Sequence, residues 1–228
     1  MSLSRVLQKK DAKAELESAL ERHLEMLSTT KEIAITRNKL GERFLYLMAI
    51  PIIYAAWEGF FRVSMAICLK RTCVKGRKAN SYSKGYVGLW LQKQGFVESF
   101  VRNLLNAMNL GSPIKAGPGR FLALSEFSRN HQDFLAAPFN HLEDFDKLVM
   151  TYSNVNGAVV ELNCRCIGLD SSKIDLSRLN ELLNRRNDIA HGGLLDYPRL
   201  ETVAELIEYT TQLMKSFNAE TISWIRTN

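Results

Sequence analysis

Cysteine is scarce in this chain, and its arrangement argues against a metal centre. The 228 residues include 4 cysteines, Cys68, Cys73, Cys164 and Cys166. They form no paired CxxC arrangement, and no histidine stands at zinc-finger spacing from them. We therefore predict no metal and no cofactor. A chain with few cysteines and no secretory leader is also expected to keep its thiols reduced in the cytoplasm.

Two other features are missing, and each excludes a class of protein. The Gly/Pro-rich loop at residues 110–122 lacks P-loop spacing, so the sequence gives no support for nucleotide hydrolysis and assigns this loop no role. The uncharged run at residues 44–57 is about 14 residues long, whereas a helix that spans a bilayer needs roughly 20. We therefore predict a core helix here and no membrane partner.

Strand-like alternation, internal repeats, low-complexity tracts and Gly/Ser linkers are also absent, which favours an all-α chain with a single domain at 1–228. A charged helix is expected at 1–40 and two core helices at 41–72 and 174–192. Shorter helical segments are expected at about 84–109, 121–136 and 139–167, and Pro198 opens a final helix. Its predicted core stripe is Val203, Leu206, Ile207, Thr210, Leu213, Met214 and Phe217.

The most informative helix is the one expected from Ile174 to His191, after which the pair Gly192-Gly193 supplies a left-handed cap. Its apolar face holds Leu176, Leu179, Leu182, Leu183, Ile189 and Ala190. Arg186 falls in the middle of that face. Asn187 and His191 are one turn apart on its edge, whereas Arg185 points elsewhere.

Two interpretations of this arginine remain open. Basic residues at the end of a helix favour the negative end of its dipole, which is an ordinary structural pattern. A buried guanidinium, however, needs an acidic partner or a polar cavity to offset its desolvation. Glu58, in the apolar helix at 41–72, can pair locally with Arg62 or reach across to Arg186. In the second case Glu58 would orient Arg186 or His191.

These residues resemble the HEPN superfamily. The segment 186–192, Arg-Asn-Asp-Ile-Ala-His-Gly, is similar to the arginine-to-histidine motif of that superfamily. The segment 54–61, Tyr-Ala-Ala-Trp-Glu-Gly-Phe-Phe, looks like the second signature of small stand-alone prokaryotic HEPN proteins associated with toxin-antitoxin and restriction systems. The resemblance implies a helical bundle with long antiparallel helices that dimerises. In many members it implies a metal-independent endoribonuclease, while other members only bind.

The residues suit that chemistry. Metal-free RNA cleavage needs a base for the 2′-OH, an acid for the leaving oxygen and a stabilised phosphorane. His191 can exchange protons near neutrality, Arg186 matches two phosphate oxygens, and Asn187 can donate to a phosphate or fix the imidazole tautomer. One histidine is too few for both proton transfers, so the motif predicts a site shared by two copies. The predicted catalytic set is Arg186, Asn187, His191 and Glu58.

Basic residues suggest where RNA would bind. The chain carries a formal net charge of +6, and Lys75, Arg77, Lys78 and Lys84 lie in a stretch without acidic residues. Tyr82, Tyr86 and Trp90 offer stacking surfaces nearby. A solvated basic loop is the alternative. The other histidines, His23, His131 and His141, are expected at the surface.

The leading hypothesis is a homodimeric endoribonuclease that acts as a toxin or defence effector, with RNA as substrate and an antitoxin or restriction protein as partner. The alternative is a non-catalytic HEPN module that binds RNA, nucleotide or a protein in the same groove. A third, purely structural adaptor would keep Arg186 paired with Glu58 and sealed from solvent.

Overall fold

The computed structural model describes residues 7–36, 42–73, 83–93, 125, 128–129, 132–133, 136, 145–152, 154–192 and 197–228. Within these residues every regular element is a helix, as the sequence predicted. The chain divides into two compact units, one formed by residues 1–72 and 145–228 and the other by residues 73–144. The single domain expected from the sequence stays a prediction.

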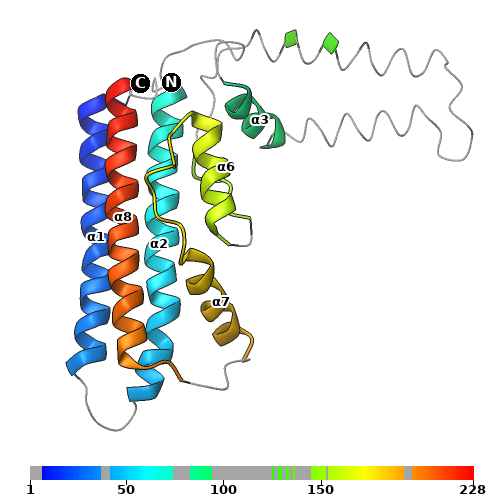
Figure 1. The fold of residues 1–228 in the computed structure, drawn as a ribbon. Coiled ribbons are helices and arrows are strands. Elements are labelled where there is room, and N and C mark those ends of the chain that lie inside the picture. The colour runs from blue at the N-terminus through cyan, green and yellow to red at the C-terminus, as the bar shows by residue number, and fades with distance from the viewer. Residues whose placement is uncertain are drawn as a thin grey trace, which may run out of the picture. The chain divides into compact units, whose positions relative to one another are not determined.

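Three long helices form the body of the first unit. They are α1 (Lys9–Thr36), α2 (Glu42–Cys73) and α8 (Leu200–Thr227), and α1 runs antiparallel to the other two (Figure 1). The beginning of α1 meets the end of α8, where Lys9 Nζ donates to the Arg226 carbonyl at 2.7 Å. The bounds of α2 agree closely with the helix predicted at 41–72, whereas α1 begins later and ends earlier than the helix predicted at 1–40.

The core between α2 and α8 is aromatic. Trp57, Phe60 and Phe61 of α2 surround Phe217 of α8, with ring centroids 5.7, 6.3 and 5.4 Å from that of Phe217. All four side chains are fully buried. Such aromatic pairs add about 0.5–1.5 kcal/mol each beyond the area they bury. All seven residues of the predicted stripe of α8 are buried, which confirms the helical period read from the sequence.

The long helix α2 also passes a test for membrane-spanning helices. Its part from Arg43 to Thr72 is long and apolar enough to cross a bilayer, by length and composition only. Half of its most apolar window is buried, and the core helix of a soluble protein can pass the same test. The predicted absence of a membrane partner stays a prediction.

His23 of α1 is not a surface residue, contrary to the prediction. Its ring is half-buried and meets Phe60 edge-on with centroids 6.0 Å apart, while Nδ1 lies 2.7 Å from the Ala19 carbonyl oxygen. Glycine at position 59 makes this approach feasible, because a Cβ there would lie 2.8 Å from His23 Nε2. The other two histidines assigned to the surface, His131 and His141, lie outside the described residues.

The helix predicted at 139–167 is interrupted. The structure has a short 3-10 helix, η2 (Phe145–Lys147), then an irregular segment, and then α6 (Gly157–Ile167). Asn156 begins α6 because its side chain accepts a hydrogen bond from Val159 N at 2.9 Å, a typical N-cap. Asn163 in α6 is fully buried and hydrogen-bonds both the backbone N–H and the carbonyl of Met150. These side-chain bonds hold the preceding chain in a non-helical path.

The motif helix α7 (Leu179–Ala190) begins later than the predicted residue 174. Asp175 accepts a hydrogen bond from Ser177 N at 3.0 Å, and Asp170 accepts one from Ser172 N at 2.9 Å. Such local turns compete with helix for the backbone donors, which explains the delay. The end of the helix agrees with the prediction, since Gly192 takes the left-handed conformation with φ 69°. Gly193 lies outside the described residues.

In the second unit the structure describes α3 (Lys84–Lys93). Tyr86 and Leu89 of this helix are buried, whereas Lys84 is exposed. The remainder of the helix predicted at 84–109 lies outside the described residues. So does most of the predicted segment at 121–136, of which the described residues are helical.

Candidate active site

The apolar face of α7 is buried at its beginning and opens toward its end. Leu179, Leu182 and Leu183 are buried, as predicted, whereas Ile189 is half-buried. Ala190 is exposed, contrary to its predicted place in the core, because it belongs to the last turn of the helix. Polar residues of the motif therefore occupy the part of the helix that the core covers least.

Arg186 lies at this transition, half-buried between two other segments of the first unit. Its guanidinium carbon is 5.2 Å from the ring centroid of Tyr54 on α2. Its Nη1 donates to Asn154 Oδ1 at 3.2 Å and to Asn187 Oδ1 at 2.9 Å. Partners for the guanidinium thus come from α2, from the segment before α6 and from α7 itself.

None of these partners is charged. Among the residues that the structure describes, no carboxylate oxygen lies within 4.0 Å of the Arg186 guanidinium nitrogens. Neither of the ion pairs considered for Glu58, with Arg62 or with Arg186, is formed. The positive charge of Arg186 is therefore oriented by neutral groups and is not cancelled by a direct ion pair with any described residue.

Glu58 lies near Tyr54 and forms no ion pair with Arg186. Burial, first of all, raises the pKa of Tyr54 to about 12, and the carboxylate of Glu58 also raises it. The hydrogen bond from Val155 N to the Tyr54 hydroxyl, at 2.7 Å, and the charge of Arg186 lower this pKa. Tyr54 is consequently protonated near neutral pH, and its hydroxyl accepts a hydrogen bond from Val155 N.

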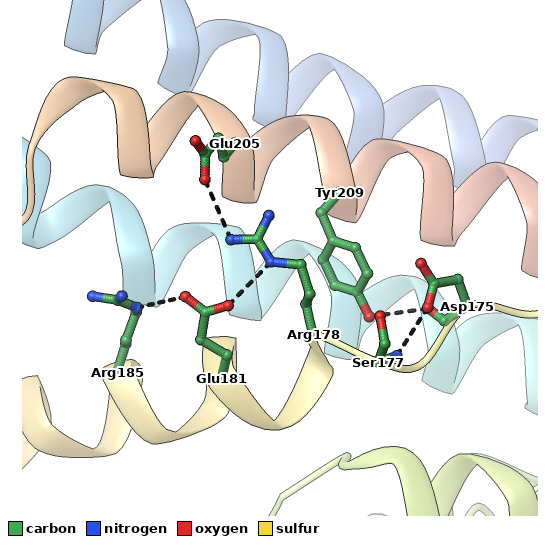
Figure 2. A network of polar contacts seen from close by, with 7 residues as sticks. All are labelled: Asp175, Ser177, Arg178, Glu181, Arg185, Glu205 and Tyr209. Atoms are coloured by element: carbon green, nitrogen blue, oxygen red, sulfur yellow. Dashed lines mark hydrogen bonds and ion pairs between the residues drawn. The ribbon is translucent and has the colours of Figure 1, made fainter.

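The neighbouring Arg185 is held quite differently. Its Nε donates to Glu181 Oε1 at 3.0 Å, and the other oxygen of Glu181 accepts from Arg178 Nε at 3.0 Å (Figure 2). Arg178 also reaches Glu205 of α8 at 3.5 Å and lies over the ring of Tyr209, 5.9 Å from its centroid. Arg185 and Arg178 are thus neutralised in a network that ties α7 to α8, while Arg186 is not.

Asn187 and His191 follow on the same edge of α7. The Asn187 side-chain oxygen is turned toward Arg186, which leaves its NH₂ group without a partner among the described residues. His191 is exposed and caps the helix, with its backbone N–H on the Asn187 carbonyl at 2.9 Å. The imidazole is accessible to solvent, and no bond from its ring to another described residue is formed.

Two residues of this arrangement were not assigned to the site from the sequence. Tyr54 belongs to the segment 54–61 that carried the family resemblance, so its position gave some signal. The sequence gave no signal for Asn154, because this residue stands 32 residues before Arg186 and no local pattern links the two. The catalytic roles predicted for Arg186, Asn187, His191 and Glu58 stay predictions.

Of the four predicted RNA-binding residues, one is described by the structure. Lys75, Arg77 and Lys78 lie outside the described residues, as does the loop at 110–122. Lys84 is the exposed first residue of α3 in the second unit.

The side chains of three cysteines are described, and all three are buried and outside any disulfide: Cys68, Cys164 and Cys166. Burial is the main cause that raises the pKa of each, to about 12 for Cys164. These thiols are therefore protonated at neutral pH and poorly suited to act as nucleophiles. Within the described part of the chain, no group of three or more His, Cys, Asp or Glu residues is placed to hold a metal ion.

Comparison with known proteins identifies the family of the chain. The sequence matches the RiboL-PSP-HEPN family over residues 14–222, a span that contains both segments that carried the resemblance. Neither the curated proteins nor the solved structures contain a significant match. The all-α bundle is therefore HEPN-like, and the chain belongs to the RiboL-PSP-HEPN family.

Proposed function

We propose that this protein is a metal-independent endoribonuclease that cleaves RNA by attack of the 2′-OH on the adjacent phosphate. The observation that carries the proposal is the half-buried Arg186, which neutral groups orient and no described carboxylate neutralises. A fixed guanidinium without a counter-ion attracts an anion, and its planar fork matches two oxygens of a phosphate.

The neighbours of Arg186 supply the remaining chemistry. In this proposal Arg186 stabilises the charge that develops on the phosphorane, and the free NH₂ group of Asn187 donates to the same oxygens. His191 is exposed at the end of the helix and transfers the proton, because an imidazole can act as base or acid near neutrality. Glu58 acts on Arg186 through Tyr54 rather than by direct contact.

Both a base and an acid are needed, and one chain offers one histidine at this place. We propose that a second copy supplies the other across a two-fold axis, so that the site is completed by a homodimer. An exposed apolar stripe on α2 fits this role. Phe44, Met48 and Ile52 are 59%, 41% and 36% exposed and follow one another at helical spacing.

This stripe belongs to the helix that also carries Tyr54 and Glu58. A second copy that covers it would therefore contact the same helix against which the Arg186 guanidinium rests. The biological role that suits such an enzyme is a toxin or defence effector in the cytoplasm, restrained by an antitoxin or restriction-system partner. The basic residues Lys75, Arg77, Lys78 and Lys84 are proposed to hold the RNA outside the site.

The test uses purified wild type, His191→Ala, Arg186→Ala and Arg185→Ala with mixed structured and single-stranded RNAs in excess EDTA. We expect wild type to leave 2′,3′-cyclic phosphate ends. His191→Ala should lower the rate about 10²- to 10⁴-fold, the usual contribution of a general acid or base. Arg186→Ala should lower it about 10²- to 10³-fold, as for loss of an oxyanion donor.

Arg185→Ala is the matched control, because it removes a neighbouring arginine whose charge is already paired with Glu181. Its rate should stay close to that of wild type. Intact RNA with every protein would reject the enzyme and favour the alternative, a HEPN module that only binds. In that case RNA affinity should still fall in Arg186→Ala and not in Arg185→Ala.

A further inference from the structure

We infer that Tyr54 is the positioning residue of this site: its ring sets the plane of the Arg186 guanidinium, and its hydroxyl locks that ring in place. The inference rests on the proposed function for its effect on cleavage. The orientation of Arg186 itself is a separate claim that can be tested without RNA.

The guanidinium of Arg186 lies over the ring of Tyr54. Tyr54 is 1% exposed, so its ring cannot move far, and the guanidinium carbon lies 5.2 Å from its centroid. Attraction between a guanidinium and an aromatic face is stronger where water is excluded, as at this half-buried place. The ring therefore limits the guanidinium to orientations roughly over its face, while Asn154 and Asn187 both accept from Nη1.

The hydroxyl of Tyr54 is held by the backbone. Val155 N donates to it at 2.7 Å, and the carboxylate of Glu58 lies close enough to raise its pKa. Val155 follows Asn154 directly, so one short segment anchors both the tyrosine hydroxyl and the arginine Nη1. The tyrosine, the asparagine and the arginine thus form one connected arrangement across three segments of the chain.

Orientation matters because the two outward nitrogens must meet two phosphate oxygens together. In the described part of the chain, Nε and Nη2 of Arg186 have no hydrogen-bond partner, so they are the donors left for a phosphate. The other arginine that lies over a tyrosine ring, Arg178, is oriented by ion pairs with the carboxylates of Glu181 and Glu205. Arg186 lacks such acids, and a ring can direct a guanidinium without neutralising it.

The experiment compares two tyrosines in matched environments. Tyr209 also lies beneath an arginine, Arg178, and its hydroxyl donates to the Asp175 carbonyl at 3.0 Å. Tyr54→Leu and Tyr54→Phe are compared with Tyr209→Leu and Tyr209→Phe. Each is checked for folding by circular dichroism and thermal unfolding. The proton shifts of the Arg186 side chain, assigned by their loss in Arg186→Ala, are then measured by NMR.

We expect the Arg186 protons of wild type to be shifted upfield by the Tyr54 ring. This shift should vanish in Tyr54→Leu, weaken in Tyr54→Phe because the ring loses its bond to Val155 N, and persist in both Tyr209 variants. In EDTA, Tyr54→Leu should lower kcat about 10- to 100-fold, the effect of a misplaced catalytic group, with a smaller change in KM. Tyr54→Phe keeps the ring and should recover most of that loss.

Several outcomes would overturn the inference. If the proton shifts of the Arg186 side chain in folded Tyr54→Leu equal those in wild type, the ring does not orient the guanidinium. If wild type cleaves RNA and Tyr54→Leu has the same kcat, the orientation of the Arg186 guanidinium has no catalytic effect. If wild type does not cleave RNA at all, the proposed function fails. The Arg186 shifts then still decide whether Tyr54 positions the arginine.

Discussion

Arg186 and Tyr54, from two different helices, meet with the guanidinium carbon 5.2 Å from the ring centroid and no described carboxylate within ion-pair distance. This contact resolves the two interpretations that the sequence left open. The arginine is neither an ordinary helix-end cation in solvent nor a member of a sealed pair with Glu58. It is a partly buried cation whose partners among the described residues are all neutral.

Acid should weaken the network that ties α7 to α8. Hydrogen bonds from Arg178, first of all, and from Arg185 hold the pKa of Glu181 below its ordinary value of 4.5. A carboxylate with a lowered pKa in the fold adds stability above its unfolded pKa, and this stability is lost as pH falls through the folded pKa. The free energy of unfolding should therefore drop between about pH 5 and pH 3.

Glu181→Gln should remove part of this drop and lower stability at pH 7 by about 0.5 kcal/mol, because the carboxylate is more than a third exposed and solvent screens it. Urea unfolding at several pH values measures both effects. Glu25→Gln, on the exposed side of α1, changes the charge equally and should leave the pH dependence as in wild type. If Glu181→Gln and wild type lose the same free energy of unfolding as the pH falls, Glu181 does not cause the loss.

The close approach of His23 to Gly59 makes a second prediction. Alanine is favoured over glycine in a helix by about 1 kcal/mol. At position 59, however, its Cβ would lie 2.8 Å from His23 Nε2, and the Ala19 carbonyl and Phe60 hinder the ring from moving away. Overpacking of this kind costs about 1–3 kcal/mol, so Gly59→Ala should be destabilising.

The effect of Gly59→Ala on stability should change sign when the His23 side chain is removed. In a His23→Ala background, Gly59→Ala should stabilise the protein by up to about 1 kcal/mol, because only the gain in helix propensity remains. A double-mutant cycle by chemical denaturation measures the coupling. Additive effects of the two substitutions would show that the contact does not explain the glycine.

The proposed dimer surface can be tested with two exposed methionines. Met48→Glu places a charge in the stripe of α2, and Met26→Glu places one on α1, where Met26 is 37% exposed. We expect Met48→Glu to give a folded monomer that has lost about 10²-fold or more in cleavage rate, because the second histidine is missing. Met26→Glu should remain dimeric and active. Light scattering after gel filtration gives the mass, and a wild-type monomer would refute the dimer directly.

Local patterns explain which parts of this structure could be predicted from the sequence. The stripe of α8 from Val203 to Phe217 was predicted correctly because one buried face repeats with the period of a helix. The glycine cap at Gly192 was predicted because few residues adopt a left-handed conformation easily. Both signals lie within a few residues of the feature that they predict.

Parts of the site depend instead on contacts between distant segments. The bond from Val155 N to the Tyr54 hydroxyl spans 101 residues, and that from Arg186 to Asn154 spans 32. No spacing rule signals either of them. The start of α7 was misplaced for a different reason, because the side chain of Asp175 competes with the helix for backbone donors. The prediction placed Arg186 on the buried face of the helix, where it is half-buried, and missed two of the groups that hold it, Tyr54 and Asn154.

Charge rather than shape should decide the activity of Arg186, and Asn154 offers a way to separate the two. Asn154→Asp keeps the size of the side chain and its acceptor 3.2 Å from Nη1, but places a carboxylate on the guanidinium. The new ion pair should hold the fold at least as well, by about 0–1 kcal/mol. It should nevertheless lower RNA cleavage about 10²-fold, because the neutralised arginine no longer stabilises the phosphorane.

Asn156→Asp is the matched control, since it makes the same change two residues away. Asn156 caps α6 through its side-chain oxygen, and aspartate caps helices equally well, so stability and cleavage should both stay close to wild type. The comparison needs thermal unfolding and cleavage rates for the two variants. Full activity in Asn154→Asp would mean that an uncompensated charge on Arg186 is not what the reaction uses, and the phosphate would then have to be bound elsewhere.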